Sequence, residues 1–292
     1  MTPLRFKKFI VPDLVSHCTF TLRINRHRKQ VTTETKQWLF KDGNLLGQKR
    51  AAYHGLKAGL LTAMCYPDAA FPQLRVCNDF LTYLFHLDNL SDDMDNRGTR
   101  SVADEVLNSL YHPHTWRSPA RVGKMAREYV FFLTSWRTLT DISAFSYYKR
   151  LILTGSSGAQ RRFIETMDFF FQSVTQQALD RATGVIPDLE SYIALRRDTS
   201  GCKPCWALIE CKLFSASVHR LILTSCLDAN NLDIPDEVME HPLIVSLGEA
   251  TNDLVTWSNV SIPTPVLQSN VFTSVDLGYI FVQCRAVQGR YS

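Results

Sequence analysis

Apolar residues recur at spacings of three and four along most of the chain, which is the period of a helix with one buried face. Short polar, glycine- or proline-containing breaks separate these segments, as is usual for connections between helices. The predicted helices cover residues 48–66, 72–90, 158–182, 188–200, 205–218 and 235–259. No break resembles an interdomain linker, and no internal repeat is present. The pattern predicts an all-α fold built as one single-domain helical bundle.

The composition is typical of a soluble globular protein, with 292 residues, 45% hydrophobic and 21% charged. The formal net charge of +4 conceals an uneven distribution, because residues 1–60 carry 12 Lys and Arg but only 3 Asp and Glu. No nucleic-acid-binding signature accompanies this excess, so a solvated face is the favoured interpretation and no nucleic-acid partner is expected.

Cellular location follows from cysteine usage and from the absence of targeting patterns. Eight scattered cysteines in a chain this long do not form a disulfide framework, which favours the reducing cytoplasm. The first residues lack the apolar core of a signal peptide, and no run is long enough to span a membrane. Cys202 and Cys205 form a C-x-x-C pair, but no second Cys or His pair lies at zinc-site spacing, so a structural role is favoured over metal or redox chemistry.

A dense acidic stretch follows an apolar run. If residues 78–92 form a helix, Asp88 and Asp92 lie one turn apart on one face, and Leu84 and Phe85 continue toward an apolar well. Two carboxylates at such a rim suit Mg²⁺, which prefers oxygen ligands and is often shared with phosphate. The alternative is a helix end that simply runs into a polar loop.

A second predicted helix carries further oxygen donors. Asn252 and Thr256 are separated by one turn, with Asp253 adjacent to the first of them. These side chains could serve as capping or core hydrogen-bonding groups. Opposite an aspartate-rich rim, they are also candidate metal ligands.

A third helix contributes a cation. Tyr192, Arg196 and Thr199 follow one helical face, and the planar guanidinium of Arg196 suits a phosphate group. A solvated or ion-paired surface is the alternative interpretation of its arginines.

Together these motifs resemble those of the class I terpene synthases, most closely the basidiomycete sesquiterpene synthases. Three segments carry the resemblance: the aspartate-rich box Asp88-Asn89-Leu90-Ser91-Asp92, the diphosphate-sensing segment with Arg196, Asp198, Thr199 and Gly201, and the box Asn252-Asp253-x-x-Thr256. An Asn/Thr box in place of a second aspartate-rich motif favours cyclisation or lysis over chain elongation.

The resemblance implies a lyase that ionises a linear prenyl diphosphate, with farnesyl diphosphate the expected substrate, and cyclises the carbocation. It implies three Mg²⁺ ions between the two boxes. The implied metal ligands are Asp88, Asp92, Asn252 and Thr256, and the implied diphosphate-binding residues are Arg196, Thr199 and Gly201. The candidates for folding the prenyl chain are Leu84 and Phe85, with Phe80 and Trp257.

The chain departs from the family pattern after residue 259. The third ligand of the Asn box, usually Glu, is expected at position 260, where Val260 has no oxygen donor. Residues 260–292 contain Pro263 and Pro265 and lack a helical period, and the family's C-terminal helices with their Arg-Tyr pair are missing. We therefore divide the chain into a terpene synthase-like domain, 1–259, and an atypical tail, 260–292.

A retained intron would explain this tail, because Val260 and Ser261 can be encoded by a splice-donor sequence. A catalytically inactive, truncated synthase is therefore the alternative to an active cyclase. A helical interaction protein without a ligand is a third interpretation, and it would require all three motifs to be coincidental.

Overall fold

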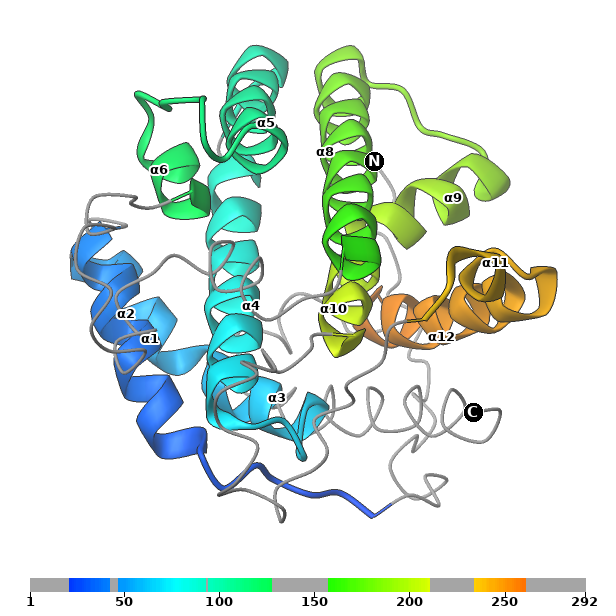
Figure 1. The fold of residues 1–292 in the computed structure, drawn as a ribbon. Helices are drawn as coiled ribbons and strands as arrows, with labels where there is room; N and C mark the ends of the chain where they lie inside the picture. The colour runs from blue at the N-terminus through cyan, green and yellow to red at the C-terminus, as the bar shows by residue number, and fades with distance from the viewer. Residues whose placement is uncertain (1–20, 43–46, 93, 128–156, 211–233, 261–292) are drawn as a thin grey trace, which may run out of the picture.

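The computed structural model describes residues 21–42, 47–92, 94–127, 157–210 and 234–260. Every regular element in these ranges is a helix (Figure 1), which confirms the predicted all-α class. The helices are α1 (Arg28–Asp42), α2 (Gly47–Gly55), α3 (Ala58–Cys65), α4 (Phe71–Asp92), α5 (Asn96–Tyr111), α6 (Arg121–Arg127), α8 (Ser157–Thr183), α9 (Leu189–Thr199), α10 (Cys202–Ala207), the 3₁₀ turn η2 (Leu208–Glu210), α11 (Asp236–Met239) and α12 (Pro242–Val260).

Three predicted helices are confirmed, and two others are each divided. The confirmed ones are α4, α8 and α9. The segment 48–66 forms two helices because Lys57 has a left-handed backbone, with φ of 52°, which interrupts the helical path. The segment 235–259 divides before Pro242, because a proline disfavours helical geometry in the residue that precedes it.

The remaining differences concern helices that were not predicted from the sequence. Helices α1, α5 and α6 were not predicted. For α5 a signal was available, since the Asp95 side chain caps the helix by accepting a hydrogen bond from the Gly98 amide at 2.7 Å. The predicted segment 205–218 begins earlier, at Cys202, and its part beyond residue 210 lies outside the described residues, as does the tail 261–292.

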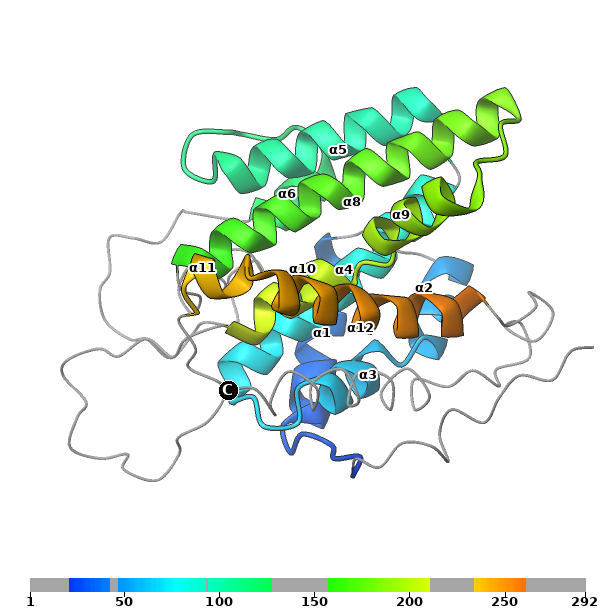
Figure 2. The ribbon, with the colours of Figure 1, turned by 90° about the vertical axis from the view of Figure 1, so that its right-hand side faces the viewer.

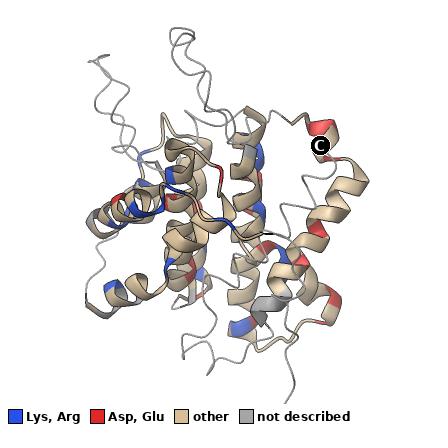
Figure 3. Cartoon of the chain, turned by 90° about the horizontal axis from the view of Figure 1, so that it is seen from below, with Lys and Arg blue, Asp and Glu red and all other residues tan. Residues whose placement is uncertain are grey.

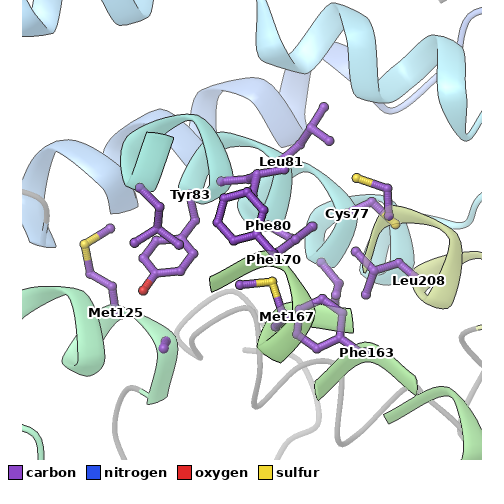
Figure 4. Packing of buried hydrophobic residues seen from close by; sticks show 14 of the residues in the cluster. Cys77, Phe80, Leu81, Tyr83, Met125, Phe163, Met167, Phe170 and Leu208 are labelled. Atoms are coloured by element: carbon purple, nitrogen blue, oxygen red, sulfur yellow. The ribbon is translucent and has the colours of Figure 1, made fainter. Parts of the chain in front are cut away.

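The core draws side chains from α4 and α8, and α1 and α3 also pack against α4; in Figure 1, α1 lies to the left of α4 and α8 to its right. Phe80 of α4 is completely buried, and its ring meets Phe163 of α8 edge to face, with centroids 4.9 Å apart. Met167 and Phe170 extend the same contact (Figure 4). Each such side chain contributes about 1.5–3 kcal/mol when fully buried, so this contact fixes the position of α4.

A buried ionic cluster joins α1 to α4. Nε of Arg75 donates to both carboxylate oxygens of Asp79, at 2.8 and 3.0 Å, and Nη1 donates to Glu34 at 2.6 Å. Arg75 and Asp79 are almost completely buried. Burial lowers the pKa of Arg75, and the charge of Glu34 opposes that shift. The buried Arg75 charge thus faces two carboxylates, in keeping with the rule that a buried charge needs a charged partner.

Helices α9, α10 and α12 meet beside this core, and their junction is called the corner below. Helix α8 leads into α9, which turns back into α10, and α12 packs against both α9 and α10 (Figures 1 and 2). Lys and Arg residues are distributed over several helices together with Asp and Glu (Figure 3). Within the described ranges, none of the helices combines the length and the apolar character needed to cross a membrane.

Candidate functional site

The aspartate-rich box lies at the C-terminal end of α4. Asp88 is exposed there, one turn after Leu84 and therefore about 6 Å further along the axis. Asp92 is the last residue of α4, and its side chain lies outside the described part of the structure. The predicted placement of the box at a helix end is thus observed, while the spacing of the two carboxylates is not described.

Arg196 and Thr199 meet at the end of α9. Nη1 of Arg196 donates to Oγ1 of Thr199 at 3.1 Å, and Gln177 of α8 reaches the same oxygen at 3.4 Å. Nε of Arg196 is buried and has no hydrogen-bond partner. A buried guanidinium donor without a partner is costly unless a ligand supplies an acceptor. This nitrogen is therefore suited to an anionic oxygen.

Gly201 brings this corner against α4. Its φ of +69° is left-handed, a conformation that glycine adopts without steric cost. A Cβ added to it would lie 2.5 Å from Cδ2 of Leu84. Two of the predicted site residues, Gly201 and Leu84, are therefore in direct contact, one turn below Asp88.

A long-range hydrogen bond also holds this corner in place. The hydroxyl of Tyr66, at the end of α3, donates to the backbone carbonyl of Cys205 at 2.7 Å. Both groups are buried. The corner is therefore held from the α3 side as well as from α4.

Asn252 joins α12 to the corner. Its Nδ2 donates to the carbonyl of Arg197 at 2.6 Å, and its Oδ1 accepts from the hydroxyls of Ser200 at 2.7 Å and Thr256 at 3.2 Å. Asn252 and Thr256 are both buried. The predicted pairing of these two side chains on one face of a helix is confirmed, and each is already engaged in hydrogen bonds.

The two remaining acidic residues of the motifs are ion-paired. Asp253 receives a bidentate contact from Arg197, at 2.8 and 2.7 Å, and Arg197 also reaches Glu249 at 3.1 Å. Asp253 contributes most to raising the pKa of Arg197. Asp198 is paired with Lys203. Neither Asp253 nor Asp198 is therefore an uncompensated carboxylate.

The aromatic candidates have different surroundings. Phe80 is a fully buried core residue whose ring packs on Phe163. Phe85 is partly buried at the edge of the same core, near the Asp88 end. Tyr192 is partly buried on α9, and the side chain of Trp257 lies outside the described residues.

The C-x-x-C pair is buried within α10. Cys202 and Cys205 are free thiols, each only 2% exposed. Burial raises the pKa of Cys202 to about 11 and places that of Cys205 well above its ordinary value. These thiols are therefore protonated at neutral pH and pack as apolar side chains.

The side chains at this site match the needs of Mg²⁺ and a diphosphate group only in part. Asp88 offers a carboxylate and Arg196 an unused donor, which suit Mg²⁺ and phosphate oxygen respectively. The Oδ1 of Asn252 already accepts from two hydroxyls, whereas Thr256 is the donor in its bond to Asn252 and keeps its own oxygen lone pairs. Among the side chains that the structure describes, no three His, Cys, Asp or Glu residues are grouped to hold a metal.

Sequence reasoning missed two residues of this site. Ser200 bridges Asn252 and the backbone of α9, and Arg197 binds α12 through Asp253. Both contacts join α9 to a helix some 50 residues further along the chain, and no spacing in the sequence indicates that proximity.

Comparison with solved structures identifies the fold. The fold matches that of hedycaryol synthase in complex with nerolidol, with a TM-score of 0.64, 17% identity, and coverage of 95% of this chain and 84% of that one. It also matches an ancestral reconstruction named SVS_A2, with a TM-score of 0.63, 18% identity, and coverage of 83% and 65%. The fold is thus that of terpene synthases.

Sequence comparison gives the family. Residues 79–259 match the family model described as terpene synthase family 2, C-terminal metal binding. Sesquiterpene synthase Agr1 of Cyclocybe aegerita is 71% identical over 267 residues, 91% of this chain and 67% of that protein. Alpha-muurolene synthase of Coprinopsis cinerea is 46% identical over 254 residues, 86% of this chain and 53% of that protein. The chain belongs to terpene synthase family 2, and it spans between about half and two thirds of the length of these relatives.

Proposed function

We propose that the chain is a Mg²⁺-dependent sesquiterpene synthase, a carbon–oxygen lyase that ionises farnesyl diphosphate, releases diphosphate and cyclises the resulting carbocation. The contact between Leu84 and Gly201 carries this proposal, because it joins the Asp88 end of α4 to the Arg196 corner. Two of the relatives are named sesquiterpene synthases, which supports a sesquiterpene as the product.

The metal-binding residues in this proposal are Asp88, Asp92, Asn252 and Thr256, holding the three ions that the family resemblance implies. Bound Mg²⁺ would neutralise the negative charge that develops on the departing diphosphate. Asp88 is already accessible at the rim, whereas Asn252 must give up the hydroxyl contacts at its Oδ1 before that oxygen can bind a metal.

Arg196 is proposed to bind the diphosphate directly. Its Nε would donate to a phosphate oxygen, which satisfies a buried donor that the protein itself leaves without a partner. Thr199 holds the guanidinium in place through its contact with Nη1. A preorganised, partly buried donor stabilises leaving-group charge more strongly than one in bulk water.

Leu84 and Phe85 would line the apolar part of the site and exclude water from the carbocation. The reaction is proposed to occur in the cytoplasm, which is consistent with the free thiols of the four described cysteines. Membrane and nucleic-acid partners are not part of the proposal.

A second candidate function is a chain that binds prenyl diphosphate without turning it over. Val260 supports this alternative, because the family's third ligand at that position is usually Glu and valine offers no oxygen. The hydrogen bonds of Asn252 support it too, since they weaken the other half of the same metal site.

The deciding experiment incubates the purified chain with farnesyl diphosphate and Mg²⁺ and follows hydrocarbon products by gas chromatography with mass detection. An Asp88→Ala variant should lose product formation by several orders of magnitude. Asp104→Ala, which removes an exposed carboxylate from α5, is the matched control and should retain activity.

Product from the native chain, lost only in Asp88→Ala, would support the cyclase. Folded protein that binds farnesyl diphosphate in the presence of Mg²⁺ but forms no product would favour the binding-only alternative. A folded chain that neither binds nor converts the substrate would refute both.

A further inference from the structure

Ser200, between α9 and α10, has one hydroxyl hydrogen and two acceptors within reach. Its Oγ lies 2.7 Å from Oδ1 of Asn252 on α12 and 3.0 Å from the backbone carbonyl oxygen of Arg197. A serine hydroxyl carries a single hydrogen that can rotate, so it donates to only one of these oxygens at a time. The Ser200 hydroxyl therefore has two alternative hydrogen-bonded states.

The surrounding contacts hold the Ser200 oxygen in place in both states. The backbone amide of Cys202 donates to Oγ at 3.2 Å, whichever acceptor the hydroxyl hydrogen takes. Nδ2 of Asn252 donates to the same Arg197 carbonyl at 2.6 Å, which keeps the Asn252 amide beside Ser200. Both acceptors are already at hydrogen-bonding distance, so the exchange needs only a rotation of the hydroxyl hydrogen.

The two states differ in what they leave available on Asn252. Its Oδ1 has two lone pairs, and the hydroxyls of Ser200 and Thr256 occupy both of them when both donate to it. When Ser200 donates to the Arg197 carbonyl instead, one lone pair on Oδ1 becomes free. Asn252 is completely buried, and a buried lone pair without a partner is costly. Without a ligand, the bond from Ser200 to Asn252 is therefore the favoured one.

We propose that Ser200 is a positioning residue for Asn252. Its hydroxyl occupies Oδ1 when no ligand is bound, and it turns to the Arg197 carbonyl when a cation and a diphosphate enter the site. The inference rests on the proposed function. The Ser200 hydrogen keeps an acceptor in both states, so freeing Oδ1 costs less than breaking a buried hydrogen bond outright. Because Ser200 directly follows α9, this exchange links α12 to the end of the helix that carries Arg196.

This role predicts opposite effects of one substitution on stability and on binding. Replacing Ser200 with alanine removes a donor from Asn252 when no ligand is present. In the occupied site that oxygen faces a cation, and the Arg197 carbonyl still accepts from Nδ2 of Asn252. The variant should therefore lose more stability without ligand than with it. A purely structural hydroxyl would instead stabilise both states, and its loss would leave binding unchanged or weaker.

The test compares Ser200→Ala and Ser109→Ala with the native full-length chain. Isothermal titration with inorganic pyrophosphate at fixed Mg²⁺ gives the dissociation constant, and thermal melting without ligand reports the fold. For Ser200→Ala we expect a lower melting temperature and pyrophosphate binding about two- to fivefold tighter, since one net hydrogen bond is typically worth about a fivefold change in an equilibrium constant.

Ser109 of α5 is the matched control, because its buried hydroxyl donates to the Glu105 carbonyl at 2.6 Å, on a helix that carries none of the proposed ligands. Ser109→Ala should bind pyrophosphate as the native chain does. Ser200→Thr keeps a hydroxyl and should restore native binding. If Ser200→Ala does not fold, Ser200→Cys replaces it with the same expectation, because a thiol is a much weaker donor.

The outcomes separate this inference from the function on which it rests. If Ser200→Ala binds pyrophosphate as tightly as the native chain, or more weakly, the positioning role is overturned and the proposed function stands. Equal tightening in Ser109→Ala or in Ser200→Thr would likewise overturn it, because the gain would then not come from the lost donor. If the native chain fails to bind pyrophosphate at any Mg²⁺ concentration, both the function and the inference fall.

Discussion

Replacing Gly201 with alanine should destabilise the protein through two separable effects. The first is backbone strain, because an alanine at φ of +69° adopts a left-handed conformation that costs about 1–2 kcal/mol. The second is a clash, because the new Cβ would lie 2.5 Å from Cδ2 of Leu84, and such overpacking costs about 1–3 kcal/mol. The expected loss is therefore roughly 2–5 kcal/mol of the free energy of unfolding.

Gly184 offers a matched control. Its φ of +67° is nearly the same, but no atom lies within 4 Å of a Cβ built there. It follows α8 in a C-capping turn in which the Val185 amide donates to the Asp180 carbonyl at 3.0 Å. Gly184→Ala should therefore lose only the strain of about 1–2 kcal/mol.

Urea denaturation of the unliganded chains would measure both losses, with equal m-values required for the comparison. A Leu84→Ala background should remove the clash and reduce the cost of Gly201→Ala to that of Gly184→Ala. The reasoning would be refuted if Gly201→Ala cost no more than Gly184→Ala, or if its cost were unchanged when Leu84 is alanine.

Three further predictions concern polar or thiol side chains that are fully or partly buried. Arg75→Met should lower the free energy of unfolding by about 3–5 kcal/mol, because it leaves the buried Asp79 carboxylate without its cation. A urea midpoint close to that of the native chain would contradict this prediction. Ser200→Ala should lower the free energy of unfolding by about 1 kcal/mol, because it removes one of the two hydroxyls that donate to Asn252. Urea denaturation would measure this difference, and an unchanged free energy of unfolding would mean that the bond contributes nothing to stability. Burial raises the pKa of Cys202 to about 11, so the thiol is almost fully protonated at pH 8. Because iodoacetamide reacts with the thiolate, Cys202 should resist modification in the native protein at pH 8 and react after unfolding. Rapid modification of the native protein at Cys202, mapped by mass spectrometry, would contradict this prediction.

Of the helices that the sequence predicted correctly, α4 and α8 bury an apolar face in the core, whereas α9 was predicted although none of its residues is fully buried. Helix α4 was predicted over 72–90 because its apolar positions pack on several neighbours. Helix α1 was missed because it is predominantly polar, and it is held in part by the Arg75 cluster, which depends on tertiary contacts. Local breaks at Lys57 and before Pro242 divide predicted helices without changing the fold class.

The candidate site was predictable where a motif lies on one helix. The helix-end position of Asp88 and the pairing of Asn252 with Thr256 follow from spacing alone. The bridge through Ser200 does not, because it depends on where a separate helix packs. Sequence periodicity reports which face of a helix is buried, but it does not report which partner covers that face.

The hydrogen bond from Tyr66 to the Cys205 carbonyl also has a consequence for folding. Its two ends are 139 residues apart, and the loop-closure entropy for such a contact must be overcome before it adds stability. The corner that presents Arg196 is therefore expected to form late, after α3 and α4 have packed. Slow amide exchange in α4 combined with faster exchange at the end of α9 would be the experimental signature of that order.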